Sequence, residues 1–205
     1  MNKSEPEKFS NVELKREIIK NKVLLIDNFD SFTYNLSHCL EISGFNVTIL
    51  RNNNRALFDV ISKVSHIVIS PGPSTPQNSG FSKEIVSRFY KEKRILGICL
   101  GMQAINEVLG GDTIKAPFPV HGKINRIAID NSSNLFRDMP ALIKAARYHS
   151  LICSNICSQL AVTSEHDNIP MAFEHKNYPL YGIQFHPESF LTEYGLKIIS
   201  NFFRI

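Results

Sequence analysis

The sequence of 205 residues contains no apolar run long enough to span a membrane, no internal repeat and no low-complexity tract. We also expect no secretory signal, because the charged N-terminus has no apolar core segment. These absences argue against membrane-spanning, fibrous and secreted classes of protein. With 43% apolar and 20% charged residues, the composition is typical of one globular domain, and we expect a cytoplasmic location.

Cysteine is scarce: there are four, at positions 39, 99, 153 and 157. In a cytoplasmic setting we expect reduced thiols rather than disulfide bonds. Cys153 and Cys157 are separated by three residues, but no second Cys or His pair with the spacing of a zinc site accompanies them. We therefore expect no metal ion, and nothing else in the sequence indicates a cofactor.

The sequence also lacks a basic stripe. Its formal charge is +4, but residues 1–22 hold six basic and four acidic residues and so account for +2 of it. The rest of the chain is nearly balanced, which is typical of a solvated surface rather than a phosphate-binding face. We expect neither nucleic acid nor a membrane as a partner.

Residues 1–21 are polar and rich in charge, and we interpret them as a flexible N-terminal extension of a domain that spans residues 22–205. In the first half of this domain, continuous apolar strands alternate with helical segments. This pattern predicts an α/β fold with a mostly parallel twisted sheet and helices on both faces. The expected strands are residues 23–27, 46–50, 66–70 and 95–98, and the expected helices are residues 31–43 and 81–90.

The second half is richer in Pro and Gly and has shorter strand-like runs, such as residues 124–129. It predicts hairpins and an edge of the same sheet. A helix over residues 192–203 is expected to close the chain.

The sharpest chemical signal is Gly97-Ile98-Cys99-Leu100-Gly101, placed where a strand ends and a helix begins. It has the form of a nucleophile elbow with cysteine as the nucleophile, and glycine on both sides allows the tight turn. A thiol at a helix N-terminus favours the thiolate, and the N–H of Leu100 could serve as an oxyanion donor. Taken alone, the motif could equally be a buried cysteine in a tight turn.

A cysteine nucleophile needs a base, and the base needs an orienting group. The segment from Gly182 to Ser189 carries His186 and, two residues later, Glu188. On a strand these two side chains would project to the same side, so Glu188 could hold one ring nitrogen while the other faces the thiol. By itself, a histidine before Pro-Glu is more often a surface or capping residue.

A third element, Ser70-Pro71-Gly72-Pro73-Ser74, follows a buried strand. Ligands of such sheets lie outside the carboxyl ends of the strands, so this loop is expected beside the elbow. Proline would stiffen it and allow the N–H of Gly72 to act as a second oxyanion donor. A simple turn would explain the same residues.

Residues 96–103, together with residues 182–189, resemble the class I (triad type) glutamine amidotransferases, which have a flavodoxin-like fold. The resemblance extends over the chain from Val23 onward. Residues 25–36 and 147–151 are similar to one branch, the small subunit (component II) of anthranilate synthase and of aminodeoxychorismate synthase.

The resemblance implies that Cys99 attacks the side-chain amide of L-glutamine, that His186 transfers the proton to ammonia and that Glu188 orients His186. The residues that it implies contact glutamine, by side chain or backbone, are Gly72, Pro73, Ser74, Leu100, Gln103, Ser150 and Leu151. Two positions depart from many relatives: Met102 stands in place of histidine, and Ser74 in place of glycine or cysteine. Neither position carries the chemistry.

The resemblance also implies a partner, a chorismate-binding synthase subunit (component I) that receives the ammonia. It leaves open whether the product serves tryptophan synthesis, folate synthesis or both. The segment His121-Gly122-Lys123 resembles a family segment near the site, and we expect a signalling or contact role there, with an ordinary turn as the alternative.

Three other interpretations remain. An α/β-hydrolase-like esterase with a cysteine nucleophile is disfavoured because that fold orders its triad nucleophile, acid, histidine, whereas here the acid follows the histidine. A flavodoxin-like module without catalysis is the second, and an amidotransferase of another class I branch is the third.

Overall fold

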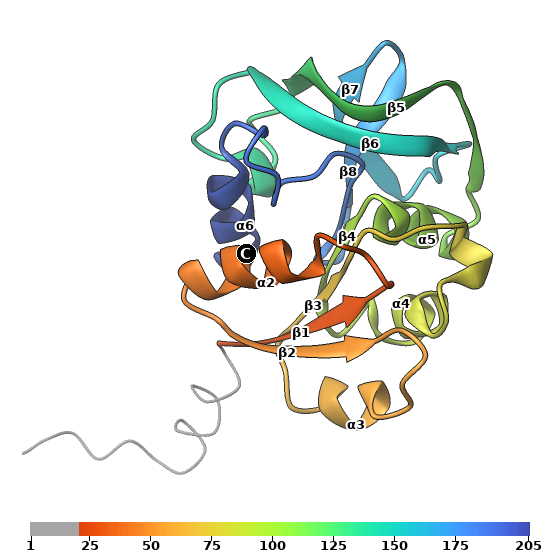
Figure 1. Ribbon diagram of the computed structural model, residues 1–205, viewed down its shortest axis with the longest axis vertical. Helices are drawn as coiled ribbons and strands as arrows, with labels where there is room; N and C mark the ends of the chain where they lie inside the picture. Colours follow the sequence, from red (N-terminus) through yellow and green to blue (C-terminus); the bar gives the residue numbers. More distant parts are fainter. Residues whose placement is uncertain (1–20) are drawn as a thin grey trace, which may run out of the picture.

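The computed structural model describes residues 21–205, and in this part of the chain nine strands form one mixed sheet with helices packed against it (Figure 1). The predicted extension over residues 1–21 lies, apart from Asn21, outside the described residues. The strand order is β2-β1-β3-β4-β9-β8-β7-β5-β6. The strands are β1 Lys22–Asp27, β2 Asn46–Arg51, β3 His66–Ile69, β4 Arg94–Ile98, β5 Asp112–Ile129, β6 Leu142–Ser154, β7 Leu160–His166, β8 Ile169–His175 and β9 Leu180–Ile183.

The helices are α2 Thr33–Ile42, α3 Leu57–Ile61, α4 Ser82–Phe89, α5 Leu100–Val108 and α6 Gly195–Phe203, with 3₁₀ turns η1 Pro76–Asn78 and η2 Asn134–Phe136. Among residues 21–205, no helix combines the length and the apolar character needed to cross a membrane.

Alternate residues of β1 enter two different hydrophobic cores, which shows that both faces of the sheet are covered. Val23 and Leu25 pack with side chains of α2 and α6, whereas Leu24 and Ile26 pack with side chains of α3, α4 and α5. Each fully buried side chain of this kind contributes about 1.5–3 kcal/mol. The α/β fold expected from the sequence is confirmed, and the five strands β2, β1, β3, β4 and β9 are parallel.

The remaining strands extend the sheet with antiparallel pairs. The run expected at residues 124–129 is only the end of β5, which is 18 residues long. Its pairing with β6 is interrupted between Lys115 and Val120, and Pro117 and Pro119 lie in that interruption. Because proline has no N–H to donate to a ladder, strand prediction stops there although the chain continues in the same direction.

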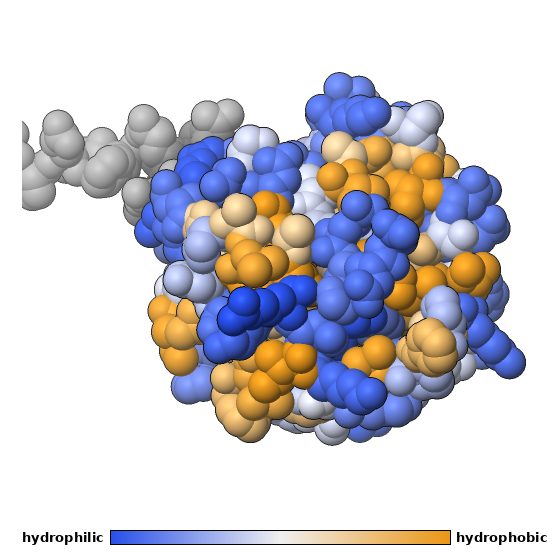
Figure 2. All heavy atoms as spheres, turned by 90° about the horizontal axis from the view of Figure 1, so that it is seen from above, coloured by the Kyte–Doolittle hydropathy of each residue, from blue (hydrophilic) through white to orange (hydrophobic). Residues whose placement is uncertain are grey.

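Viewed from the end that carries β5, β6 and β7, the surface alternates between apolar and hydrophilic groups, and no single apolar patch covers it (Figure 2). Phe118 of β5 is the most exposed large apolar residue of these three strands, at 81%.

Helix α4 begins one residue later than expected, and α2 and α6 begin two and three residues later. The segment before α2 is a turn, in which side-chain oxygens of Asp27 and Asp30 accept the N–H groups of Phe29 and Phe32. Before α6, Tyr194 adopts a left-handed backbone with φ +61, so the helix starts one residue later. The departures at α2 and α6 come from side-chain hydrogen bonds or local backbone geometry that periodicity does not reveal.

Candidate active site

Cys99 lies at the sharp turn between β4 and α5. Its backbone has φ +52 and ψ −102, which is uncommon for a residue other than glycine. Its N–H donates to the carbonyl of Ile183 in β9 at 2.7 Å. A side chain on Gly97 would collide with the backbone of Gly101. The glycines on either side of Cys99 therefore allow β4 and α5 to approach closely at the elbow.

His186 and Glu188 lie in the loop that follows β9. Nδ1 of His186 donates to Oε1 of Glu188 at 2.6 Å, and the side chains are 3% and 0% exposed. We expected His186 to end a strand and Glu188 to share its side, and this is wrong, because β9 stops at Ile183. The contact forms through a turn, in which the N–H of Ser189 donates to the carbonyl of His186 at 3.3 Å.

The backbone of His186 is fixed to β6. Its N–H donates to the carbonyl of Ala146 at 3.1 Å, and the hydroxyl of Thr192 donates to the carbonyl of His186 at 2.7 Å. The imidazole ring lies edge-on to Tyr148 and Phe32, at centroid distances of 5.0 and 5.9 Å. These contacts hold the ring in one position without using its second nitrogen.

Burial disfavours the charged imidazole and acts to lower the pKa of His186. The neighbouring Cys99 and Glu188 outweigh burial and raise this pKa to about 10. The ring therefore carries a positive charge at neutral pH, stabilised by the acidic groups on either side. Nε2 of His186 makes no hydrogen bond of good geometry within residues 21–205, although Cys99 lies close enough to raise the pKa of the ring, so Nε2 can serve a bound molecule.

Asn28 anchors the loop that carries Gly72. Its N–H donates to the hydroxyl of Ser70 at 2.9 Å, and its side-chain amide donates to the carbonyl of Ser70 at 2.8 Å. Its side-chain oxygen accepts from Asn52 and Ser82. A Cβ added to Gly72 would lie 2.5 Å from Cβ of Asn28. Hydrogen bonds through Asn28 therefore fix the loop, and position 72 has no room for a side chain.

The cavity that reaches Cys99 measures about 200 Å³. This volume suits a small metabolite rather than a polymer. Its lining comes from the Gly72 loop, the elbow with α5, and strands β5 and β6, and consists of Gly72, Pro73, Ser74, Cys99, Gln103, His121, Tyr148, His149, Ser150 and Leu151.

Six of the seven residues expected to contact glutamine line this cavity. The seventh, Leu100, is the first residue of α5, and its side chain lies against Gly72. N–H groups in the first turn of a helix have no partner within the helix, so the N–H of Leu100 stays available as a donor. Binding of glutamine by these seven residues stays a prediction.

Gln184 is a site residue that the sequence reasoning missed. It is fully buried, its side-chain amide donates to Sγ of Cys99 at 3.4 Å, and its oxygen accepts from Gln103 at 3.2 Å. Gln103 also donates to the carbonyl of Leu151 at 3.1 Å. The signal in the sequence was a glutamine inside the otherwise apolar segment of residues 180–185. A polar side chain in such a segment is expected to be buried and therefore needs hydrogen-bond partners.

His149 also lines the cavity and was noted only as part of a motif. Nε2 accepts from Nε of Arg147 at 3.1 Å, and Nδ1 donates to the carbonyl of Leu151 at 3.1 Å. Burial and the charge of Arg147 lower the pKa of His149 to about 4. His149 is therefore neutral at physiological pH, in contrast to His186.

Of the four cysteines, only Cys99 lines the cavity. All four cysteines are free, and burial raises the pKa of Cys153. Within residues 21–205, no group of three or more His, Cys, Asp or Glu side chains is arranged to hold a metal ion.

A parallel sheet that carries a cysteine on a strand-to-helix elbow, beside a buried histidine–glutamate pair, defines a class of α/β enzymes with a cysteine nucleophile. Within that class, the chain belongs to the class-I glutamine amidotransferase family, whose model matches residues 24–205.

Relatives of known name support this assignment. Anthranilate synthase component 2 of Pyropia yezoensis is 44% identical over 185 residues, which cover 88% of this chain and 97% of the relative. The protein of the same name from Thermus thermophilus is 41% identical over 186 residues, covering 88% of this chain and 91% of the relative.

Solved structures agree on the fold. A Thermoplasma acidophilum protein, named as a candidate component of GMP synthase, superposes with a TM-score of 0.81 at 26% identity, covering 89% of this chain and 92% of that one. A glutamine amidotransferase from Thermotoga maritima superposes with a TM-score of 0.65 at 18% identity, covering 82% and 76%, and supports the fold alone.

Proposed function

We propose that this chain hydrolyses L-glutamine to glutamate and ammonia through a thioester on Cys99, and that the ammonia passes to a chorismate-aminating synthase subunit. The observation that carries the proposal is the cavity of about 200 Å³ that opens on Cys99, with the buried His186–Glu188 pair beside the elbow. Membership of the glutamine amidotransferase family supports the choice of substrate.

In the first half of the reaction, the sulphur of Cys99 attacks the side-chain carbonyl carbon of glutamine. A C–S bond forms, and the carbonyl oxygen takes the negative charge. His186, positively charged at neutral pH, donates its Nε2 proton to the amide nitrogen as the C–N bond breaks. Ammonia leaves, and a glutamyl thioester remains on Cys99.

In the second half, His186 is neutral and acts as the base. It takes a proton from water, whose oxygen attacks the thioester carbonyl, and the C–S bond then breaks. Glutamate leaves, the proton of its new carboxyl group passes to solvent, and the thiolate of Cys99 and the positively charged ring of His186 are restored. Glu188 holds Nδ1 throughout, so that Nε2 faces the reacting atoms, and its charge stabilises the imidazolium.

Two backbone donors can stabilise the oxyanion. The N–H of Leu100 lies at the start of α5, where the helix dipole also favours negative charge. The N–H of Gly72 is presented by the loop that Asn28 anchors. One oxyanion donor of this kind is worth about 10² to 10³ in rate.

Gln103 is suited to position the amino-acid end of glutamine. Its side-chain nitrogen is committed to Leu151 and Gln184. Among residues 21–205, no donor occupies its side-chain oxygen, which leaves an acceptor for an ammonium group. Ser150 and Leu151 of β6 line the same cavity.

The proposed partner is the chorismate-binding component I of an anthranilate or aminodeoxychorismate synthase. The relatives named anthranilate synthase component 2 support the anthranilate branch, and the sequence keeps both pathways open. Two exposed aromatic side chains lie close in sequence to residues of the site: Tyr34, two residues after Phe32, is 75% exposed, and Phe190, two residues after Glu188, is 92% exposed. Such residues are enriched at protein interfaces. The cytoplasmic location stays a prediction.

The test is steady-state glutamate release by the chain alone, with purified component I, and with both component I and chorismate. We expect the rate to rise with each addition, because interface contacts that align one oxyanion donor with the substrate are worth about 10² to 10³ in rate. A high rate for the isolated chain, unchanged by either addition, would refute the coupling and indicate an independent glutaminase. Stimulation by a different synthase alone would assign the chain to another class I branch.

A further inference from the structure

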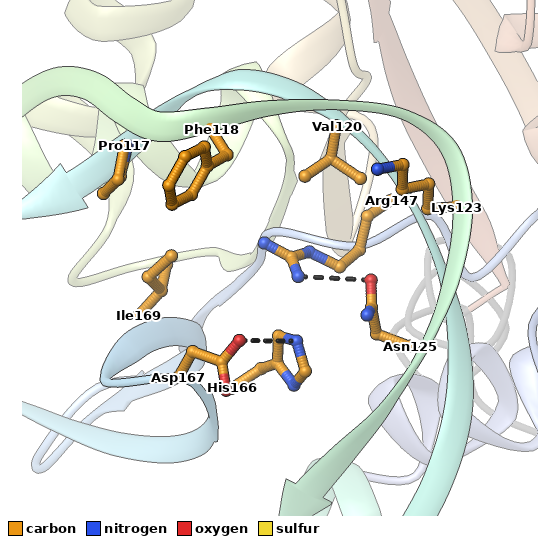
Figure 3. Close-up of a pocket in the computed structure, with 9 residues that line it drawn as sticks. All are labelled: Pro117, Phe118, Val120, Lys123, Asn125, Arg147, His166, Asp167 and Ile169. Carbon is orange, nitrogen blue, oxygen red and sulfur yellow. Dashed lines mark hydrogen bonds and ion pairs between the residues drawn. The ribbon is translucent and has the colours of Figure 1, made fainter.

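A second cavity, of about 400 Å³, opens between β5, β6 and the turn that joins β7 to β8 (Figure 3). It shares no lining residue with the cavity at Cys99. Three apolar side chains, Phe118, Val120 and Ile169, form part of its lining. The proposed reaction does not use it.

Arg147 of β6 lies in the middle of this cavity's lining, as Figure 3 shows, although the residue is only 4% exposed. Its Nε donates to His149 at 3.1 Å and its Nη1 donates to Asn125 at 3.2 Å. Both acceptors are uncharged. Among residues 21–205, Nη2 has no hydrogen-bond partner and no carboxylate lies within ion-pair distance of the guanidinium. A buried cation with only neutral partners lacks an opposite charge to offset the free-energy cost of its removal from water.

The nearby charges leave an excess of positive charge. Lys123 lines the same cavity and is exposed. The one acidic side chain in the lining, Asp167, lies 3.2 Å from Nε2 of His166 and is 82% exposed, so it faces mostly solvent. Burial lowers the pKa of Arg147, and the charge of Asp167 acts to raise it. Arginine nevertheless stays protonated in proteins, so the guanidinium keeps its charge.

We propose that this cavity binds a small organic anion in which one carboxylate is attached to an apolar group. The carboxylate accepts from Nη2 of Arg147 and pairs with Lys123, and the apolar group packs against Val120 and Ile169. A guanidinium matches carboxylate geometry better than a point charge does. Because part of the lining is apolar, an inorganic anion would leave those side chains without a contact.

One hydrogen bond connects this site with the candidate active site: Arg147 donates to His149, and His149 lines the Cys99 cavity. The proposal concerns binding and does not depend on glutamine hydrolysis.

The test uses the full-length chain, labelled with ¹⁵N, titrated with sodium benzoate and followed by amide and guanidinium NMR shifts. Benzamide serves as the neutral isostere and inorganic phosphate as the anion without an apolar part. We expect saturable millimolar binding of benzoate, with shifts at residues 117–125, 147 and 166–169, and binding at least about tenfold weaker for both comparison compounds. Prior alkylation of Cys99 should leave the benzoate titration unchanged.

Variants separate the proposal from a general effect of charge. Arg147→Gln should weaken benzoate binding at least about tenfold, and Lys123→Gln by about two- to fivefold. Lys115→Gln is the matched control for Lys123→Gln, because Lys115 also lies in β5 but does not line the cavity. This variant should bind benzoate as the parent chain does. If Arg147→Gln fails to fold, benzoate binding by Lys123→Gln and by Ile169→Ser tests the proposal instead, and both variants should bind more weakly than the parent chain. Equal binding of benzamide, shifts confined to the Cys99 cavity, or no saturable shift would overturn the proposal.

Discussion

The side-chain amide of Gln184 donates to Sγ of Cys99 at 3.4 Å, while its oxygen accepts from Gln103 at 3.2 Å. This fully buried side chain thus joins the proposed nucleophile to the residue proposed to hold the substrate. A neutral donor at the sulphur stabilises a negative charge there without placing a second cation in the site.

Replacing Gln184 with Leu keeps the volume roughly constant and removes both hydrogen bonds. An unsatisfied buried partner costs about 1–3 kcal/mol, so we expect kcat/KM for glutamine to fall about five- to hundredfold. Steady-state glutamate release in the assembled complex measures this. Gln159→Leu, at an exposed position, is the control. Equal losses in the two variants would show that Gln184 has no special role.

Cys99→Ala should abolish glutamine-dependent product formation and leave the assembled complex able to use added ammonia. The reason is that only the nucleophile has gone, whereas the acceptor site lies on the partner. Product formation with glutamine and with ammonium salts, measured side by side, tests this. Loss of both activities together would contradict the division of labour.

A glutamine-mimicking alkylator should label Cys99 in preference to Cys39, Cys153 and Cys157. Cys99 opens on the substrate cavity at a helix N-terminus, whereas burial raises the pKa of Cys153 and, with the charge of Glu188, that of Cys39. Peptide mass spectrometry after partial labelling measures the distribution. Uniform labelling would count against the assignment.

His186→Ala should cost more activity than Glu188→Gln. Removing the histidine forfeits general acid–base catalysis, worth about 10² to 10⁴-fold. The glutamine substitution keeps a hydrogen-bond acceptor for Nδ1 at the 2.6 Å contact and loses the charge. Glutamate release by both variants decides the order, and a larger loss in Glu188→Gln would reverse the proposed roles.

The pKa of His186 gives a prediction for pH. Because Cys99 and Glu188 raise it to about 10 from an ordinary value of 6.5, the charged ring stabilises the folded state fully below about pH 6.5. This contribution is lost as pH rises towards 10. Cys99→Ala removes one of the raising groups, so NMR titration of the ring should show a lower pKa in that variant. An unchanged pKa would mean that Cys99 and His186 do not interact.

The local sequence pattern alone predicted the strand–helix alternation and the elbow. The buried strands read as continuous apolar runs, and glycines on both sides of Cys99 marked a turn in which no side chain fits. Local patterns of this kind depend on neighbours in sequence, so they can be read without coordinates. The family resemblance added the residues expected to contact the substrate glutamine, which periodicity could not identify.

The same patterns misplaced the contact between His186 and Glu188. Alternation along a strand suggested it, but the chain leaves β9 at Ile183 and the two side chains meet through a turn held by Thr192. Side-chain hydrogen bonds to a distant strand determine that geometry, and they do not appear in local sequence.

The sequence by itself determined which residues could do chemistry and that the chain alternates between strands and helices, because both depend on residue type and short-range spacing. Only the tertiary structure decided which buried polar groups meet. Gln184 reaches Cys99 from 85 positions away, and Arg147 lies in a cavity between β5 and β8 without an acidic partner among the described residues. Partners of buried polar groups are fixed by the packing of distant strands, which no local pattern records.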